Sequence, residues 1–372
     1  MKIIPGSRRR HYVARVSIFL IAIALVAGMA GCPPIPPPSQ DLEIRDWYDL
    51  DDVRNNLAGN HTLMNNLDST TAGYTELASP TANGGKGWRP IGKITGVSGT
   101  TFIGTVDGQG YVICDLFINR PDEMYVGLFG SVYEGGIIKN IGVVNATVTG
   151  KEIVGGLVGS NYVIVSNSYS TGSVTGGADV GGLIGDNRGT VSDCYYSGNV
   201  TGDVAVGGLV GWNTRGTVSN SYFSGNVTCI RVFNGLAAGG LVGWNDGATV
   251  INSYSSGNVT GDVVVGGLVG RNEEGTVSNS YSTGNVTGNS SVGGLVGDNT
   301  GTVNSSFWDI EASGQDHSDG GTGKTTAQMK NIATFSGAAW NIIEVGGPGA
   351  RNPAYIWNIV NGLTYPFLSW QS

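Results

Sequence analysis

Histidine, charge and cysteine are scarce in this chain, and each scarcity argues against a class of function. Only three of the 372 residues are histidine and only 13% are charged. His61 and His317 lie far apart and no His-Glu-x-x-His pattern occurs, which argues against a zinc peptidase of that type and leaves no metal site to predict. The cysteines have no spacing that defines a disulfide framework, so a bridge among Cys114, Cys194 and Cys229 stays open.

Basic residues are outnumbered by acidic ones. The formal net charge is −8, and it becomes −13 if residues 1–31, which contain five Lys or Arg and no Asp or Glu, are removed. An acidic chain repels the phosphates of nucleic acids and the head groups of anionic lipids. We therefore expect no nucleic-acid partner and no electrostatic docking to a membrane.

Only one long apolar run occurs, from Val16 to Ala30, between a basic segment and an Ala-Gly-Cys sequence that ends at Cys32. This order is typical of a secretory signal, and its end resembles a lipobox, which implies that Cys32 is diacylated. Fifteen apolar residues are short for a membrane span of about 20, although an uncleaved signal anchor is the alternative. We predict a lipoprotein signal peptide at 1–31, a Pro-rich tether at 32–40, and a lipid-anchored cell-envelope location outside the cytoplasm.

Glycine, by contrast, is abundant, with 63 residues and no Gly-X-Y period. Many belong to the phrase Gly-Gly-Leu-Val/Ile-Gly, which recurs at intervals of 26, 26, 32, 27 and 27 residues and marks a repeat protein. The longest interval has ten residues, Cys229 to Ala238, where the neighbouring repeats have five, so a loop is inserted there. The phrase begins at Gly155, Gly181, Gly207, Gly239, Gly266 and Gly293.

The composition of each repeat predicts a β-solenoid and not a helical one. Each copy is rich in Val, Tyr and Thr, which favour strands, and is interrupted every four to eight residues by Gly or Asn, which favour turns. No copy contains ten residues of helical periodicity. Coils of this length stack in parallel about 4.8 Å apart. The predicted fold class is therefore all-β, a parallel β-helix of about seven coils.

When coils stack, equivalent residues of successive repeats lie on one another. An Asn two residues after each phrase predicts a hydrogen-bonded structural ladder, and a Tyr column predicts stacked rings. The residue before each Asn varies freely, which predicts that it faces solvent. The ladder residues are Asn161, Asn187, Asn213, Asn245, Asn272 and Asn299, and the aromatic column is Tyr169, Tyr195, Tyr222, Tyr254, Tyr281 and Phe307.

In these phrases the repeat resembles the GLUG motif of bacterial and archaeal cell-surface proteins. The likeness is strong over 155–310 and extends to a degenerate copy at 127–130, which gives a repeat domain at 127–310. The resemblance implies a right-handed parallel β-helix at the cell surface. It implies no catalytic residues, because the motif has no established activity.

Both ends of the solenoid need covers. Apolar residues at helical spacing, from Trp47 to Leu57, predict a capping helix over 41–58, within an N-terminal cap and first irregular coils at 41–126. At 311–372 we predict an irregular C-terminal cap: a loop over 311–324, a helix from Thr325 with a capping box to Gln328, and an aromatic tail that closes the end.

Trp212 and Trp244 are the candidate ligand-binding residues. They share one position of adjacent repeats, where two exposed indoles would form a flat apolar platform for a sugar. The alternative is that they pack against the insertion at 229–238. The Asn-Val-Thr phrases match glycosylation acceptors but are interpreted as turn devices.

Enzymatic chemistry finds less support. The acids of the repeats are scattered, Asp179 and Asp186 among them, whereas polysaccharide cleavage needs carboxylates that converge. Residues 320–325 resemble a phosphate-binding loop, but Ser318 stands where its first glycine belongs, so we expect no nucleotide and no cofactor.

The sequence thus predicts a lipid-anchored, cell-surface β-solenoid that is not an enzyme and acts as a binding, adhesion or structural module. Polysaccharide or other envelope material is the expected ligand class. The alternative is a polysaccharide lyase or glycosidase on the same scaffold, and a further one is a stalk without a ligand.

Overall fold

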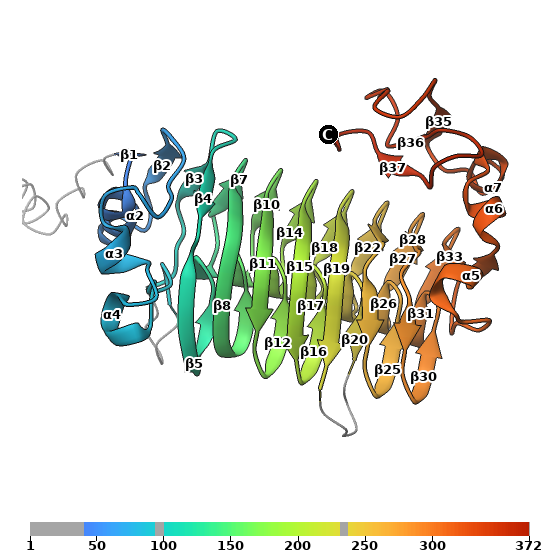
Figure 1. Ribbon diagram of the computed structural model, residues 1–372, viewed down its shortest axis with the longest axis horizontal. Helices are drawn as coiled ribbons and strands as arrows, with labels where there is room; N and C mark the ends of the chain where they lie inside the picture. Colours follow the sequence, from blue (N-terminus) through green and yellow to red (C-terminus); the bar gives the residue numbers. More distant parts are fainter. Residues whose placement is uncertain (1–40, 94–99, 231–236, 372) are drawn as a thin grey trace, which may run out of the picture. The chain divides into compact units, whose positions relative to one another are not determined.

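The computed structural model describes residues 41–93, 100–230 and 237–371, which belong to one compact unit, Gln40–Ser372 (Figure 1). The predicted signal peptide, the tether and Cys32 lie outside the described residues. Among the residues described, no helix is long and apolar enough to cross a membrane.

A parallel β-solenoid forms the body of this unit. Each full coil has a strand in sheet C, then one in sheet A, and then its strands in sheet B. One coil runs through β13 (Ile184–Asn187), β14 (Thr190–Ser192), β15 (Tyr195–Gly202) and β16 (Val204–Gly207). Sheet C has seven strands, so the predicted all-β solenoid of about seven coils is confirmed.

The other strands repeat this order. Sheet A also contains β1 (Leu42–Ile44), β2 (Asn60–Leu63), β3 (Thr105–Asp107), β7 (Ile137–Lys139), β10 (Ile164–Ser166), β18 (Thr217–Ser219), β22 (Thr249–Ile251), β27 (Thr276–Ser278) and β32 (Thr302–Asn304). Sheet C also contains β6 (Phe129–Val132), β9 (Val158–Asn161), β17 (Val210–Thr214), β21 (Val242–Asp246), β26 (Val269–Glu273) and β31 (Val296–Asn299). Sheet B also contains β4 (Val112–Cys114), β5 (Phe117–Val126), β8 (Gly142–Gly155), β11 (Tyr169–Thr175), β12 (Ala178–Gly181), β19 (Tyr222–Cys229), β20 (Ala238–Gly239), β23 (Tyr254–Ser255), β24 (Asn258–Thr260), β25 (Val263–Gly266), β28 (Tyr281–Ser282), β29 (Val286–Thr287), β30 (Ser290–Gly293), β33 (Phe307–Asp309) and β34 (Thr322–Lys324).

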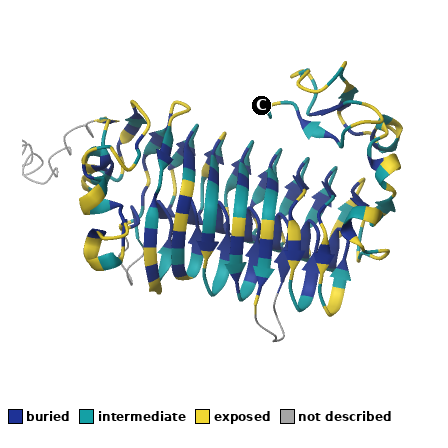
Figure 2. Cartoon of the chain, in the orientation of Figure 1, coloured by how far each residue is buried: buried dark blue, intermediate teal, exposed yellow. Residues whose placement is uncertain are grey.

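The core is a narrow column of aliphatic side chains inside the coils (Figure 2). Parallel pairing places Val165 on Val191 and Val191 on Val218, and all three side chains are fully buried. Burying one Val or Leu stabilises the fold by about 1.5–3 kcal/mol relative to exposing it. Because each coil repeats this contact with its neighbours, stability is distributed along the stack.

The six asparagines predicted to form a ladder lie in one column at the corner between sheets C and A. Each Nδ2–H donates to the Oδ1 of the next coil, with distances of 2.8, 2.7, 2.8, 2.8 and 2.7 Å from Asn161 to Asn299. All but Asn299 are fully buried. The amides therefore satisfy one another where water cannot reach them.

A second internal ladder, which the sequence reading did not anticipate, lies at the corner between sheets A and B. Each serine Oγ donates to the carbonyl two residues earlier and accepts a backbone N–H of the preceding coil, as Ser253 does at 2.8 and 3.1 Å. Cys194 replaces one serine and is fully buried, and burial raises the pKa of its thiol to about 12. The column contains Ser168, Cys194, Ser221, Ser253, Ser280 and Ser306.

The N-terminal end is covered by short helices, and the prediction of one helix over 41–58 was wrong. That segment begins with β1, and helix α2 spans only Trp47–Asp52, followed by the 3-10 turn η1 (Val53–Asn55). Pairing of β1 with β2 removes the first residues from the helix, and the Asp46 carboxylate then caps α2 by accepting two backbone N–H groups. Two further short helices, α3 (Tyr74–Leu77) and α4 (Ala82–Gly85), complete this cap.

Residues 310–324 close the far end of the solenoid. We expected a loop beyond 311, but α5 (Ile310–Ser313) and β34 form there, and β34 pairs with β33. The Ser318 hydroxyl accepts two backbone N–H groups at the edge of the last coil. The predicted capping box is confirmed: Thr325 and Gln328 begin α6 (Thr326–Met329), which α7 (Ile332–Ser336) follows.

We predicted that the aromatic tail closes the end of the solenoid. It packs instead along the Tyr column. It forms a small sheet of β35 (Ile342–Glu344), β36 (Trp357–Ile359) and β37 (Phe367–Leu368). The tyrosine rings stack as predicted, with centroids 4.6, 4.9, 5.1 and 5.0 Å apart from Tyr169 to Tyr281. Trp357 is fully buried against the rings of Tyr254 and Tyr281, so the column is the surface on which the tail folds.

Candidate functional site

The variable position before each ladder Asn is less exposed than predicted. Ser160 and Asp186 are only 1% and 4% exposed, and the later members of the column are half-buried. Sheet C packs closely against the bends of sheet B, which the glycines of the repeat permit. A Cβ atom on Gly211 would lie 2.6 Å from the carbonyl carbon of Asp179, so no larger residue fits there.

Trp212 and Trp244 pair in register on β17 and β21 but do not form a flat platform. Their rings stack with centroids 5.3 Å apart and planes 21° apart, so each covers one face of the other. The guanidinium of Arg271 lies over the Trp244 ring at 5.1 Å. The indoles are half-buried, and among the described residues neither Nε1–H has a hydrogen-bond partner. The stacking and the Arg271 contact cover ring faces, which leaves little ring face for a sugar.

The column of residues that precede the ladder asparagines continues beyond Trp244 with an ion pair. Arg271 Nε lies 3.1 Å from Asp298 Oδ2, and both line a cavity of about 170 Å³ with Glu273 and Thr300. The alternative packing of the two indoles against the insertion falls largely on 231–236, which lie outside the described residues.

Asp179 and Asp186, two acids that looked unconnected in the sequence, lie near each other at the other end of this column. The buried Asp186 accepts from Arg188 Nε at 3.1 Å and from Ser160 Oγ at 3.4 Å, while its Oδ1 has no partner among the described residues. Burial, together with the charges of Asp186 and Glu152, raises the pKa of the Asp179 carboxyl from 3.8 to about 7. Burial also raises the pKa of the Asp186 carboxyl, although the charge of Arg188 opposes that rise, so both acids of this pair are shifted upward.

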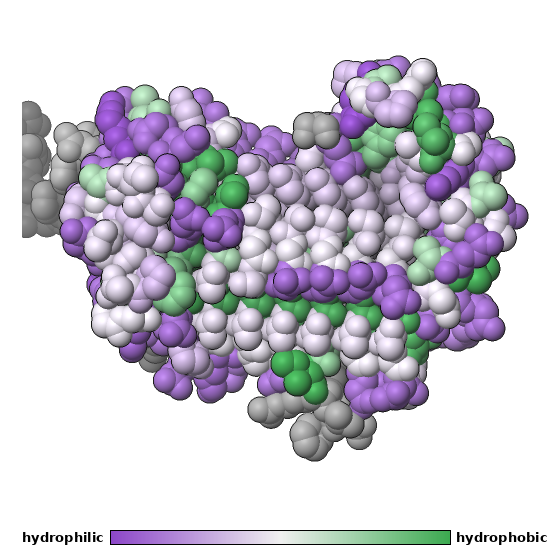
Figure 3. Space-filling view, viewed as in Figure 1, coloured by the Kyte–Doolittle hydropathy of each residue, from purple (hydrophilic) through white to green (hydrophobic). Residues whose placement is uncertain are grey.

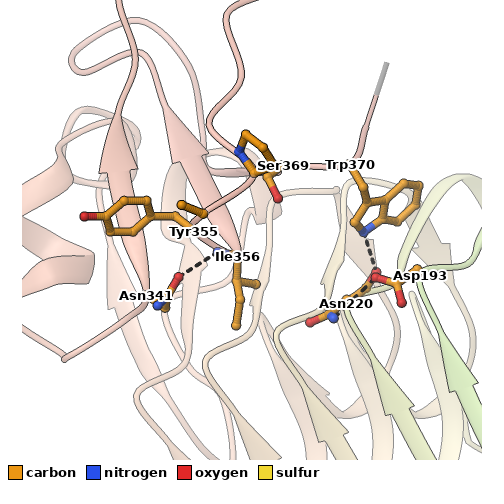
Figure 4. A pocket seen from close by; sticks show the side chains of 9 residues that line it. Asp193, Asn220, Asn341, Tyr355, Ile356, Ser369 and Trp370 are labelled. Atoms are coloured by element: carbon orange, nitrogen blue, oxygen red, sulfur yellow. Dashed lines mark hydrogen bonds between the residues drawn. The ribbon is translucent and has the colours of Figure 1, made fainter.

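The larger concave site lies between the tail and the solenoid (Figure 4). This Trp370 groove has a volume of about 400 Å³. Its floor is the turn from sheet A to sheet B, and its wall is the segment around β36 and β37. It is lined by Asp193, Asn220, Asn341, Pro353, Ala354, Tyr355, Ile356, Ser369 and Trp370.

Hydrogen bonds fix both sides of the groove. Trp370 Nε1 donates to the Asn220 carbonyl at 3.1 Å, which holds the partly exposed indole against the turn. Asn220 Nδ2 donates to Asp193 Oδ1 at 3.3 Å, and within the described residues Asn220 Oδ1 has no partner. On the wall, Asn341 Oδ1 accepts the Ile356 N–H at 2.7 Å. An indole, a carboxylate and an amide side chain thus line one cavity, and the Oδ1 of that amide is itself buried.

The electrostatics of the groove suit a hydroxyl-bearing ligand. Burial raises the pKa of the Asp193 carboxyl, and its hydrogen bonds from Asn220 and Ser192 oppose that rise. Asp193 and Asn220 both have left-handed backbone, with φ of 55° and 47°, which is tolerated by short polar residues at turns. Carboxylate and amide oxygens accept hydrogen bonds from hydroxyl groups, and an aromatic surface packs on the apolar face of a sugar ring. The sequence reading missed this site, although the aromatic tail was a signal that could have indicated it.

Neither a metal nor a nucleotide site is indicated by this geometry. Within the described ranges, no three His, Cys, Asp or Glu residues gather to hold a metal ion. The segment resembling a phosphate-binding loop contains β34, which pairs with β33 at the end of the solenoid.

Comparison with known families identifies the repeats. Residues 202–228, 234–260 and 261–287 match the family model described as the GLUG motif, which confirms the resemblance read from the sequence. The protein is thus a parallel β-solenoid in which three repeats within residues 202–287 match the GLUG motif.

Relatives share parts of this chain. A protein of Evansella cellulosilytica named "Putative Gly-rich membrane protein" is 37% identical over 123 residues, 32% of this chain and 13% of that protein. Halomucin of Haloquadratum walsbyi is 41% identical over 90 residues, 24% of this chain and 1% of that protein. The chain therefore spans a small part of both relatives.

A solved structure shares the architecture of the unit. It is described as a "putative immunoglobulin A1 protease from Bacteroides ovatus" and is 18% identical, with a TM-score of 0.51 over 90% of this chain and 94% of that one. The structural similarity shows a common fold. At an identity this low it says nothing of the activity of this protein.

Proposed function

We propose that this protein is a lipid-anchored, non-catalytic β-solenoid of the cell envelope that binds saccharide in the Trp370 groove. The observation on which this rests is the convergence of Trp370, Asp193 and Asn220 on one cavity of about 400 Å³. Saccharide sites combine an aromatic surface with a few fixed polar groups, and this cavity has both.

The envelope location draws on two independent features. The N-terminal sequence ends in a lipobox-like Ala-Gly-Cys at Cys32. One relative that shares the repeats is named as a membrane protein. A tethered solenoid would hold its groove away from the membrane and toward the surroundings of the cell.

A polysaccharide-degrading enzyme is the second candidate, and one observation favours it. Glycosidases use one protonated and one ionised carboxyl group. The pKa of Asp179 is raised to about 7 near Asp186, which pairs with Arg188 although burial raises its pKa as well. Asp186 is only 4% exposed, however, which leaves a polymer little access to its oxygens. Binding without cleavage is therefore the better supported function.

A glycan array on residues 39–372, with calorimetry and product analysis on every hit, tests the proposal. We expect binding of oligosaccharides without new reducing or unsaturated ends. Trp370→Ala and Asp193→Asn should each weaken binding by about tenfold, the loss of about one stacking or hydrogen-bonding contact. Tyr48→Ala, which removes another exposed aromatic ring on α2, should leave affinity unchanged.

Two results would contradict the proposal. Full binding by Trp370→Ala would place the ligand elsewhere, and Trp212→Ala with Trp244→Ala would then locate it. Cleavage that disappears in Asp179→Asn would establish the enzyme instead.

A further inference from the structure

The outer face of sheet B presents polar side chains in straight columns. Along β11, β15, β19, β24 and β29, a buried Val alternates with outward Asn or Ser and Thr residues. Parallel pairing aligns these residues in register between coils. We call the two columns the polar array: Ser173, Asn199, Asn226, Asn258 and Asn285, with Thr175, Thr201, Thr228, Thr260 and Thr287.

Hydrogen bonds hold the amide column in place. Asn226 Nδ2 donates to Asn199 Oδ1 at 2.9 Å, and Asn258 Nδ2 donates to Asn226 Oδ1 at 3.2 Å. These side chains are exposed, unlike the internal asparagines, and a hydrophilic row crosses the strands of sheet B in Figure 3. In this ladder Asn226 and Asn258 each donate one amide N–H, while Asn285 Nδ2 donates to Thr287 Oγ1 at 3.2 Å. Because the side chains are already ordered, a ligand that binds them causes little further loss of rotamer freedom.

The chemistry of the array defines its ligand. The five described strands contain no charged residue, although the chain has a net charge of −8. Hydroxyl and amide groups repeat once per coil, about 4.8 Å apart. A matching partner is uncharged, extended and rich in regularly spaced hydroxyl groups.

The array is continuous with the Trp370 groove. On β15, residues 195, 197, 199 and 201 alternate outward, so the Tyr column and the array share one face of the sheet. The Tyr195 and Tyr222 rings lie 6.4 and 5.7 Å from the Trp370 ring at the groove. A polymer held in the groove therefore lies beside the array.

We propose that a neutral, extended polysaccharide binds along the outer face of sheet B, with hydroxyl groups on the polar array of successive coils and one segment in the Trp370 groove. This inference rests on the proposed function in taking saccharide as the ligand. Each contact is weak, but contacts on several coils of one rigid face act together, so affinity rises with chain length.

Matched threonine variants test the array. Thr201→Val, Thr228→Val and Thr260→Val together remove three hydroxyl groups and keep the branched shape. The control is Thr190→Val, Thr217→Val and Thr249→Val, an equally regular threonine column in sheet A. Retention of residues 39–372 on insoluble cellulose, chitin and mannan is measured, with circular dichroism to verify folding.

We expect the array variant to lose at least about tenfold in affinity for the polymers it retains, the effect of three weak hydrogen bonds, and the control to stay within about twofold of wild type. Equal losses in both variants, no loss in the array variant, or no retention of the wild type on any of the polymers would overturn the proposal.

Oligosaccharide binding separates the array from the groove. A two- or three-unit oligosaccharide that fills only the groove should bind the array variant normally and Trp370→Ala poorly. If Trp370→Ala binds every ligand as the wild type does while the array variant loses the polymer, the groove proposal fails and the array proposal stands. The reverse pattern rejects the array alone.

Discussion

At the scale of single residues, the internal asparagine ladder shows how burial decides the value of a hydrogen bond. Asn213 is fully buried, accepts from Asn187 at 2.7 Å and donates to Asn245 at 2.8 Å. We expect Asn213→Ala to lower the free energy of unfolding by about 1–3 kcal/mol, because it removes one hydrogen bond from each of two amides, Asn187 and Asn245, that lie away from water. Urea denaturation followed by circular dichroism measures this change.

The exposed ladder supplies the control for that experiment. Asn226 makes the same kind of bond in solvent, so Asn226→Ala should change the free energy of unfolding by no more than about 0.5 kcal/mol. Equal effects of the two substitutions would show that burial is not what makes the internal ladder stabilising.

Asp179 gives the protein a dependence of stability on pH. Its pKa is raised from 3.8 to about 7, so the folded state binds a proton more tightly than the unfolded chain. The stability that this proton contributes is fully present below about pH 4 and is lost as the pH rises to about 7. We expect the melting temperature to fall between pH 5 and pH 7 and Asp179→Asn to remove this part of the fall.

An exposed aspartate is the matched control for this titration. Asp122→Asn makes the same chemical change on the surface and should leave the pH profile as in the wild type. A profile of Asp179→Asn that parallels the wild type from pH 5 to pH 7 would contradict the assignment.

At the scale of elements, the strands were predictable and their close contacts were not. Val, Asn and Tyr recur at one period. From that period alone it follows that identical residues of successive coils lie on one another. The exposure of the column around Trp212 depends on bends of sheet B where Ile153, Asp179 and Val264 have left-handed backbone. This conformation is rare for β-branched residues, so no local rule predicts it.

The Trp370 groove could not be predicted for a different reason. Its two sides, Asn220 and Trp370, are 150 residues apart and belong to segments with unrelated patterns. The aromatic composition of the tail indicated that it packs on something, but it did not show whether the end or the side of the solenoid receives it.

The tail is expected to detach as a unit when its anchor is removed. Trp357 is fully buried between the small sheet and the Tyr column. Trp357→Ala should destabilise this contact by about 3–5 kcal/mol, as large aromatic deletions do. Limited proteolysis should then cleave within 341–371 first and leave the repeats at 127–310 intact.

Trp370→Ala is the comparison for that experiment, because Trp370 is partly exposed at the edge of the same contact. This substitution should leave the tail resistant to proteolysis. Simultaneous digestion of tail and repeats in Trp357→Ala would show that the two unfold together.

At the scale of the whole molecule, attachment to the cell is the property that connects the solenoid to its proposed role. The acidic net charge disfavours electrostatic attraction to anionic lipid, so we expect the N-terminus to hold the protein at a membrane. Acyl chains on Cys32 would supply it at about 0.8 kcal/mol per buried CH₂ group. We therefore expect Cys32→Ser to move the protein from the membrane fraction to the soluble fraction, as measured by fractionation and detergent partitioning.

Cys114→Ser is the matched control, since Cys114 lies on β4 within the compact unit and should not affect partitioning. Mass spectrometry of the N-terminus then separates the two possible modes of attachment. Membrane retention of Cys32→Ser with residues 1–31 still present would mean that the apolar run at 16–30 is itself the anchor. In that case the lipid anchor is rejected, while the groove and the polar array keep their proposed roles because both lie within the compact unit.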